Sequence, residues 1–253
     1  MRTAAILTTA AILALSAGAA LAAELPGYIS AALSDSARPA SDTSRDANRH
    51  PGELLEFAGI RPGMTVVDLS PGGGYFTRIF AKAVGPKGHV YAYISNAGDA
   101  RMKAQGKDPD NQFADIKAAY PNVGVLHGPF SGFVTPEPVD VVWTSDNLHD
   151  FHNGPTAAAD LEAMTKGIFA SLKHGGIYMV VDHRAAKGAG PDATSKLHRM
   201  DEDIAKKETE AAGFKLVGES KILTNPSDDN TKRVFEQGEH DHTDQFVLKF
   251  RKP

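Results

Sequence analysis

The sequence predicts one α/β domain, with a mainly parallel, seven-stranded sheet that ends in an antiparallel pair and has helices on both faces. Three observations lead to this prediction. Short apolar runs alternate with helix-like runs along most of the 253 residues. A glycine-rich turn joins the first apolar run to a helix-like run, and the last two strand-like runs have no helix between them. The alternation is typical of parallel βαβ units, and the final pair predicts an antiparallel sheet edge.

The elements are expected in the following order. Pro51 begins a helix over residues 51–58, because proline suits a first helical turn. Strands are expected at residues 66–69, 89–94, 123–126, 139–144 and 177–182. Further helices are expected at 75–84, in parts of 100–120 with a break near 108–109, at 156–172 and at 198–212. Glycine-containing turns are expected at 85–88 and 173–176, and the terminal antiparallel pair at 214–223 and 244–250.

Composition limits the classes of function. Hydrophobic residues make up 42% of the chain and charged residues 23%, which suits one globular domain with a substantial core. The formal net charge of −4 gives no basic field for nucleic acid, so no nucleic-acid partner is expected. The expected partner is a small-molecule substrate. There is no cysteine, which excludes disulfides, thiolate metal sites and a cysteine-linked lipid anchor. The composition leads to no prediction of the oligomeric state.

The first 23 residues are typical of a secretory signal peptide. Arg2 gives a positive start, residues 4–19 are apolar and alanine-rich, and Ala20-Leu-Ala22 matches a small-x-small cleavage site. We therefore expect export to a bacterial periplasm without stable membrane insertion after cleavage; an uncleaved anchor is the alternative. Residues 24–50 are expected to form an N-terminal arm with helical pieces, and residues 51–253 the α/β domain.

The most informative stretch is Asp68-Leu-Ser-Pro-Gly-Gly-Gly-Tyr75, between the first strand and its helix. Glycines allow a tight turn and a close backbone approach to a ligand, and the helix start offers free N–H groups. The stretch has the order acid-x-small-x-Gly-x-Gly. It lacks the Gly-Lys-Ser/Thr of a P-loop and the Gly-x-Gly-x-x-Gly of a dinucleotide site. A nucleotide-type cofactor site is therefore predicted here.

This stretch resembles motif I of the class I S-adenosylmethionine-dependent methyltransferases, and the resemblance extends over residues 50–253. The passages Val84-Gly-Pro-Lys-Gly-His-Val-Tyr-Ala-Tyr93, Leu172-Lys-His-Gly-Gly-Ile-Tyr178 and Ala211-Ala-Gly-Phe-Lys-Leu216 also resemble that Rossmann-like fold. The resemblance implies S-adenosylmethionine as cofactor. It implies cofactor contacts from Asp68, Ser70, Gly72, Gly73, Gly74, Tyr75, Asn96, Asp146 and Asn147.

Two positions depart from the family pattern. Ser70 replaces the first glycine of motif I, and Ile94 stands where an acid commonly binds the ribose, with Asn96 following. More narrowly, the chain is similar to a group of exported, poorly characterised predicted methyltransferases. The shared passages are Arg45-Asp-Ala-Asn-Arg-His-Pro51, His149-Asp150 after the fourth strand and Asp182-His-Arg184 after the fifth.

Histidines and carboxylates gather after the fourth and fifth strands, where the predicted cleft lies. His149 and His152 are three residues apart and would share one face of a helical turn. A histidine oriented by a carboxylate can act as a general base, and His149, Asp150 and His183 are the expected catalytic residues. A metal site built from His149, His152, Asp182, His183 and His198 stays open, although the spacing matches no closed zinc motif and no metal ligand is assigned.

The expected function is methyl transfer from S-adenosylmethionine to a small molecule or an envelope component. Two alternatives remain. The first is a non-catalytic periplasmic ligand-binding protein on the same scaffold, which Ile94 and the export signal favour. The second is a metalloenzyme built on the histidine cluster.

Overall fold

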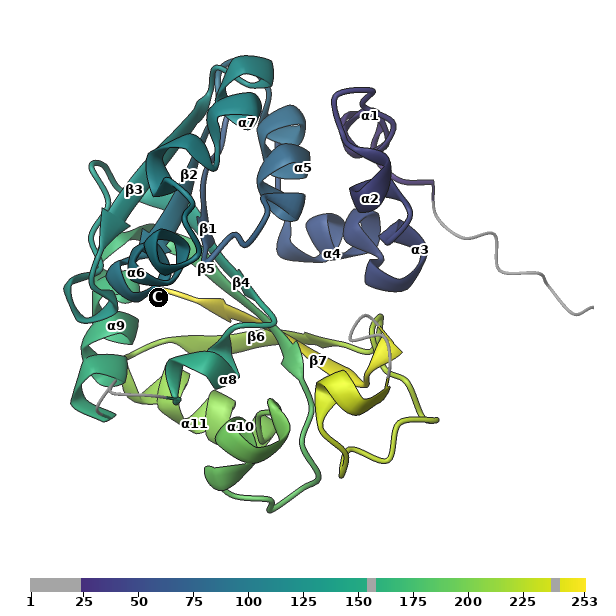
Figure 1. Ribbon diagram of the computed structural model, residues 1–253, viewed down its shortest axis with the longest axis vertical. Helices are drawn as coiled ribbons and strands as arrows, with labels where there is room; N and C mark the ends of the chain where they lie inside the picture. The colour runs from purple at the N-terminus through teal and green to yellow at the C-terminus, as the bar shows by residue number, and fades with distance from the viewer. Residues whose placement is uncertain (1–23, 154–157, 238–241) are drawn as a thin grey trace, which may run out of the picture.

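Seven strands form one sheet in the computed structural model, which describes residues 24–153, 158–237 and 242–253 (Figure 1). The sheet order is β3-β2-β1-β4-β5-β7-β6. The strands are β1 Thr65–Leu69, β2 His89–Ser95, β3 Val123–Gly128, β4 Val139–Ser145, β5 Leu172–His183, β6 Lys215–Ser220 and β7 Gln245–Arg251. Neighbours from β3 to β5 are parallel, and β7 is antiparallel to both β5 and β6. The predicted fold class, with its antiparallel terminal pair, is confirmed.

Helices surround this sheet. They are α1 Gly27–Leu33, α2 Ala40–Thr43, α3 Asp46–Arg49, α4 Pro51–Ala58, α5 Tyr75–Val84, α6 Asn96–Ala104, α7 Ala114–Ala119, α8 Leu148–Phe151, α9 Ala158–Ser171, α10 Asp192–Leu197 and α11 Glu202–Ala211. Short 3-10 turns occur at η1 Pro109–Asn111, η2 Phe130–Gly132 and η3 Val234–Gln237. The expected helices at 51–58 and 75–84 are confirmed, and the helical stretch before β3 is interrupted by η1, as expected.

The core has one layer on each face of the sheet. Val66 and Val67 show the alternation: adjacent strand residues point to opposite faces, and these two belong to different apolar clusters. The cluster with Val66 joins the sheet to α1, α4, α5 and α7, which lie together in Figure 1. The cluster with Val67 joins it to α9 and α11. Both faces are thus covered, as a mainly parallel sheet requires.

β1 lies where the strand order reverses. All its residues are buried, with β2 on one side and β4 on the other. Ligands of open α/β sheets bind beyond the carboxyl ends of the strands at such a reversal. The fold therefore directs attention to the loops after Leu69 and Ser145.

The N-terminal arm packs on the α/β domain. Ile29 and Ala32 of α1 are fully buried in the same cluster as α5. Polar contacts add to this packing: the Tyr28 hydroxyl donates to the Ile60 carbonyl at 2.8 Å, and Arg78 of α5 pairs with Asp42 at 2.9 Å. The expected helical pieces of the arm are present as α1, α2 and α3.

Two local predictions are wrong. The helix expected at 198–212 begins only at Glu202, because His198 adopts a left-handed backbone (φ 54°) that ends α10, and the Asp201 side chain caps α11 by accepting from the Asp203 N–H. The turn expected at 173–176 is an irregular part of β5. Leu172 already pairs with Val139 in β4, and regular pairing resumes at Ile177.

The predicted signal peptide, residues 1–23, lies outside the described residues. Among the helices of the described chain, none combines the length and apolar character needed to cross a membrane.

Candidate functional site

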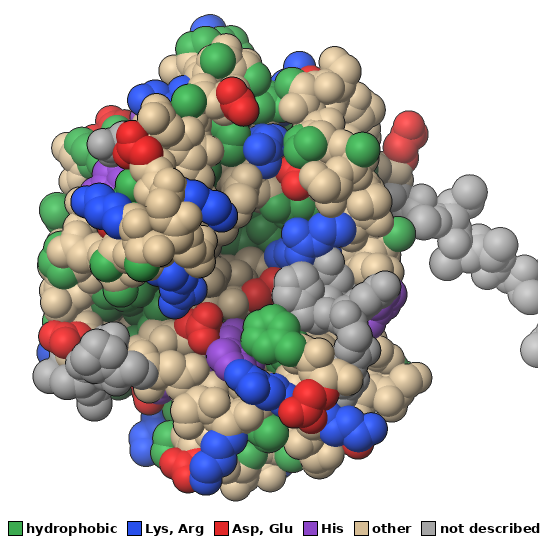
Figure 2. Space-filling model, viewed as in Figure 1, with side chains coloured by type: hydrophobic (Ala, Val, Ile, Leu, Met, Phe, Trp, Pro, Cys, Tyr) green, Lys and Arg blue, Asp and Glu red, His purple; other side chains and the backbone are tan. Residues whose placement is uncertain are grey.

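A cavity of about 300 Å³ opens at the carboxyl ends of β1, β4 and β5. Figure 2 shows a hollow in the middle of one face, with basic, acidic and histidine side chains gathered around it. The arm, the glycine loop, α8 and the segments after β5 all contribute to its wall. Among the lining residues are Arg45, Arg49, Asp68, Ser70, Gly72, Gly73, Tyr75, Asp146, Asn147, His149, Asp150, His183, His198 and Phe235. All predicted site residues except Gly74 and Asn96 are in this set.

The glycine loop has two kinds of glycine. Gly73 has open space where a Cβ would stand, and it lines the cavity. Gly74 is left-handed (φ 83°), and a Cβ there would lie 2.3 Å from the Ile116 Cδ1 atom of α7. Gly74 therefore serves the packing of the loop against α7, and its predicted cofactor contact is not supported by its position. Ser70 also has a left-handed backbone (φ 59°), which serine adopts only at some cost in free energy.

Asp68 is a buried acid at the end of β1. Its side chain accepts a hydrogen bond from the Thr77 hydroxyl at 2.6 Å. Burial raises the pKa of Asp68 from 3.8 to about 6, although the Thr77 hydrogen bond and the charge of Arg49 both oppose the rise. A carboxyl group held so far from water is stabilised in its charged form by a cationic ligand.

The N-terminal arm brings Arg49 into the cavity. Its guanidinium lies 2.9 Å from Asp146 and 3.1 Å from the Ser145 hydroxyl, and it stacks 4.7 Å from the Tyr75 ring centroid. The arm is fixed nearby by Asp46, which accepts from the Tyr75 hydroxyl at 2.6 Å and pairs with Arg38 through both carboxylate oxygens. The motif starting at Arg45 signalled this segment, but the sequence analysis did not assign its arginines to the site.

Asp146 and Asn147 follow β4 and connect the parts of the cavity. Asp146 has a left-handed backbone (φ 60°) and also accepts from the Gln245 side chain at 3.0 Å. The Asn147 side-chain amide donates to the Ser70 carbonyl at 3.2 Å, which links the end of β4 to the glycine loop. Left-handed residues other than glycine are uncommon and often lie at functional sites.

His149 is held by a buried carboxylate. Its Nδ1 atom lies 2.7 Å from Asp182 Oδ1, and its backbone N–H donates to Asp182 Oδ2 at 2.7 Å. Burial lowers the pKa of His149, but the charge and hydrogen bond of Asp182 outweigh burial and raise the pKa to about 9. The ring is therefore mainly protonated at pH 7 in the free protein, which does not suit a general base at that pH. The ring keeps its Nε2 edge towards Asp150.

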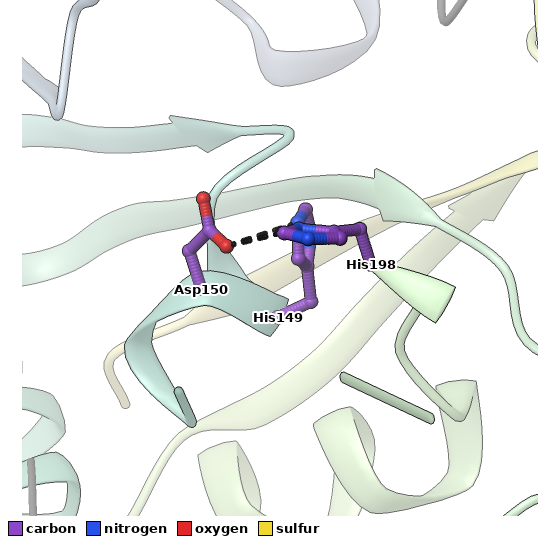
Figure 3. A group of neighbouring side chains, drawn as sticks. All are labelled: His149, Asp150 and His198. Atoms are coloured by element: carbon purple, nitrogen blue, oxygen red, sulfur yellow. Dashed lines mark ion pairs between the residues drawn. The ribbon is translucent and has the colours of Figure 1, made fainter. Parts of the chain in front are cut away.

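Asp150 lies between two histidines. Its Oδ1 atom is 3.4 Å from His149 Nε2 and 3.4 Å from His198 Nδ1 (Figure 3). His198 comes from the end of α10, about fifty residues later in the chain. Sequence analysis named it only as an open metal ligand, since its distance from His149 in the chain gave no signal of contact. Phe235, 61% exposed, packs against the His198 ring and was missed altogether.

His183 lines the cavity with its ring centroid 5.7 Å from that of His149. Its Nδ1 atom is 2.6 Å from the Thr243 hydroxyl and 3.2 Å from the Gln245 side-chain nitrogen. His152 was expected to share a face with His149. That expectation is wrong, because the His152 ring turns to Glu208 of α11 at 2.8 Å and lies outside the cavity.

Few polar side chains are available at the end of β2, where the ribose of the cofactor was expected to bind. Asn96 is exposed at the start of α6 and does not line the cavity, so its predicted cofactor contact is not supported by its position. The Ser95 side chain accepts from the Gly98 N–H as the cap of α6, and Ile94 is buried. The polar side chains that line the cavity lie instead on the arm, at the ends of β1, β4 and β5 and on the segments that follow these strands.

Solved structures similar to this chain include methyltransferases and a cyclase. A methyltransferase from Aquifex aeolicus that depends on S-adenosylmethionine superimposes with a TM-score of 0.53 at 19% identity, over 83% of this chain and 93% of that one. A Burkholderia thailandensis 1,6-didemethyltoxoflavin N1-methyltransferase with bound S-adenosylhomocysteine gives 0.55 at 18% identity, over 84% and 81%. The cyclase SpnF gives 0.58 at 15% identity, over 87% and 85%. The chain has the fold of the class I S-adenosylmethionine-dependent methyltransferases.

Sequence relatives agree with this fold. The chain is 30% identical over 128 residues to a ubiquinone/menaquinone biosynthesis C-methyltransferase from Hydrogenovibrio crunogenus, covering 51% of this chain and 45% of the relative. It is 29% identical over 133 residues to a protein-L-isoaspartate O-methyltransferase from Ignicoccus hospitalis, covering 50% and 51%. The chain thus spans about half the length of these relatives. No family model matches it.

Proposed function

We propose that this protein transfers a methyl group from S-adenosylmethionine to a small-molecule acceptor. The observation that carries the proposal is the placement of Asp68 and the open Gly73 backbone in one cavity at the strand reversal of a methyltransferase fold. A fold alone does not determine a reaction, as the cyclase with this fold shows. The sequence relatives, which are C- and O-methyltransferases, support methyl transfer.

The chemistry of the cavity fits the amino-acid end of the cofactor. Asp68 offers a carboxylate to the ammonium group, and Arg49 offers a guanidinium to the carboxylate. Gly73 leaves room for the cofactor to approach the backbone. Since Ile94 is buried and Asn96 lies outside the cavity, these contacts with the amino-acid end provide most of the polar recognition.

The acceptor occupies the other side of the cavity, between His149, Asp150 and His183. Bound S-adenosylmethionine would supply the methyl carbon: a bond from the acceptor's nucleophilic atom to this carbon would form as the carbon–sulfur bond breaks, S-adenosylhomocysteine would leave, and the proton of the acceptor would pass to solvent. The protein contributes by aligning the two reactants and excluding water, which can account for a large part of the barrier reduction. Phe235 at the mouth gives the acceptor an apolar surface to pack against.

We further propose a periplasmic location for this reaction, from the N-terminal sequence. A signal-like stretch at residues 1–23 supports export to the periplasm, where the acceptor is a small metabolite or an accessible envelope component. Cell fractionation and N-terminal sequencing of the mature protein test this part of the proposal. A full-length chain that stays in the cytoplasm contradicts it.

Methyl transfer itself is tested with methyl-labelled S-adenosylmethionine and extracts of the source organism, including its envelope fraction. We expect label to appear in an acceptor with the parent protein and with Gly27→Val, which changes an open glycine in α1. Gly73→Val should transfer no label. If the parent protein also transfers none, while another metabolite co-purifies at full occupancy, the protein is a ligand-binding protein and the proposal is wrong.

A further inference from the structure

His149, Asp150 and His198 place three ligand atoms around one point at the cavity wall (Figure 3). All three atoms lie within 4.8 Å of one another, and both nitrogens are 3.4 Å from the same Asp150 oxygen. An N–H···O hydrogen bond is shorter, at about 2.9 Å. Two ligands bound at about 2.1 Å to a tetrahedral ion are separated by about 3.4 Å. The two separations from Asp150 fit ligands of one metal ion, and the two nitrogens lie within 4.8 Å of each other, so a small approach of the two rings completes the set.

Asp182 supports this arrangement from behind. Its carboxylate accepts from His149 Nδ1 at 2.7 Å and also accepts from the backbone N–H groups of His149 and His183. Because Nδ1 donates to this fully buried group, the His149 Nε2 atom faces Asp150 and becomes a ligand when a metal ion displaces its proton. A carboxylate that orients a histidine in this way is the usual outer partner of a metal-binding histidine.

Arg233 determines which ring nitrogen of His198 carries the proton. Its guanidinium lies 3.1 Å from His198 Nε2 and can only donate, so the proton of the neutral His198 ring is on Nδ1. Coordination through Nδ1 therefore requires Arg233 to turn away. Arg233 is exposed, so it can leave this contact without disturbing the core.

We propose that His149 Nε2, Asp150 Oδ1 and His198 Nδ1 bind one divalent transition-metal ion with at least one coordination position open to the cavity. Two imidazoles and one carboxylate favour ions such as Zn²⁺ over Mg²⁺ or Ca²⁺, and three protein ligands with an open position are typical of catalytic sites. An oxygen of the methyl acceptor takes the open position; this role, unlike the metal binding itself, rests on the proposed function. The acceptor is then an oxygen-bearing molecule able to ligate a metal.

The test is a titration of untagged, chelator-treated protein with ZnCl₂ at pH 8, followed by calorimetry and elemental analysis, without cofactor. We expect one Zn²⁺ per chain and no comparable binding of Mg²⁺. Asp150→Asn and His198→Asn should each weaken Zn²⁺ binding by tenfold or more; asparagine tolerates the left-handed backbone at position 198. Asp182→Asn should weaken it by about 10- to 100-fold. Arg233→Ala should strengthen it.

Two control variants exclude binding elsewhere. His152→Ala removes a histidine outside the cavity, and a double change of His240 and His242 to alanine removes the histidines near the C-terminus. Both should bind Zn²⁺ like the parent protein. Absence of stoichiometric Zn²⁺ binding overturns the inference, as does binding that survives both Asp150→Asn and His198→Asn or is lost in a control variant.

A parallel titration with S-adenosylmethionine in excess chelator separates the two proposals. If the cofactor binds but Zn²⁺ does not, the metal site is wrong and the proposed function stands. If Zn²⁺ binds but the cofactor does not, the metal site stands and the proposed function is wrong.

Discussion

Replacement of Asp68 by asparagine removes the charge that we assign to the ammonium group of the cofactor. The exchange keeps the shape of the side chain and an oxygen that can accept from Thr77. It isolates the carboxylate charge as the property under test.

The magnitude follows from the pKa of Asp68, which burial raises to about 6. In the free protein, Asp68 is ionised to about 9% at pH 5 and to about 91% at pH 7, a tenfold difference. If only the ionised form binds the ammonium group well, the affinity for S-adenosylmethionine rises about tenfold between pH 5 and pH 7. Asp68→Asn should abolish this rise, and at pH 7 it should bind about 10- to 100-fold more weakly, the usual loss for a charged hydrogen bond.

Calorimetry at pH 5, 6 and 7 and constant ionic strength measures this effect. 5′-Methylthioadenosine, which lacks the amino-acid end, is the control ligand. Its affinity should not show the Asp68-dependent rise, so other titrating groups are accounted for. Equal pH slopes in the parent protein and Asp68→Asn would refute the assignment of Asp68.

The same raised pKa affects stability. The pKa of Asp68 in the folded protein exceeds 3.8, the ordinary value for an aspartate and the one expected in the unfolded chain. Folding therefore favours the protonated form of Asp68. The contribution of Asp68 to the free energy of unfolding is therefore fully present below about pH 4 and is lost as the pH rises through 6, by about 3 kcal/mol. The free energy of unfolding of Asp68→Asn, measured relative to the parent by denaturant titration, should therefore rise as the pH increases from 4 to 7. A difference that stays constant over this range would contradict the raised pKa of Asp68.

Four further variants test other parts of the cavity. Gly73→Val should prevent cofactor binding with little change in Tm. Gly74→Val should lower Tm, because a branched side chain is strained at the left-handed backbone of this position (φ 83°) and Ile116 would also have to move. The reverse order in thermal melts and calorimetry would contradict the loop geometry. Ser70→Gly should raise the free energy of unfolding by about 1 kcal/mol by relieving a left-handed serine, and a loss in urea titrations would show that its side chain stabilises the loop. Arg49→Gln should weaken S-adenosylmethionine binding by about tenfold or more but leave 5′-methylthioadenosine binding unchanged, and equal losses for both ligands would remove Arg49 from the amino-acid end.

Local sequence patterns were sufficient for the fold. The helix at 75–84 has the predicted bounds, because a glycine turn precedes it and Gly85 follows it. Local patterns failed where a single residue has an unusual backbone. The helix expected to begin at His198 begins only at Glu202, because His198 is left-handed, and nothing in its neighbours signals that conformation.

The candidate site was predicted only where its residues follow strands directly. Asp68 lies at the end of β1 and His149 follows β4, and parallel strands bring their carboxyl ends to one edge. His198, Arg49 and Phe235 reach the cavity from segments whose positions depend on tertiary packing. Likewise, Gly74 differs from Gly73 by a left-handed backbone and by its position against Ile116, and neither can be read from three consecutive glycines.

Titration of the purified protein with S-adenosylmethionine and S-adenosylhomocysteine, by calorimetry at pH 7, tests the central claim most directly. We predict that both ligands bind with a stoichiometry of one per chain, and that Gly73→Val binds neither while Gly27→Val binds both. If the folded parent protein binds neither ligand at millimolar concentration, the cavity is not a site for this cofactor and the proposed function is wrong.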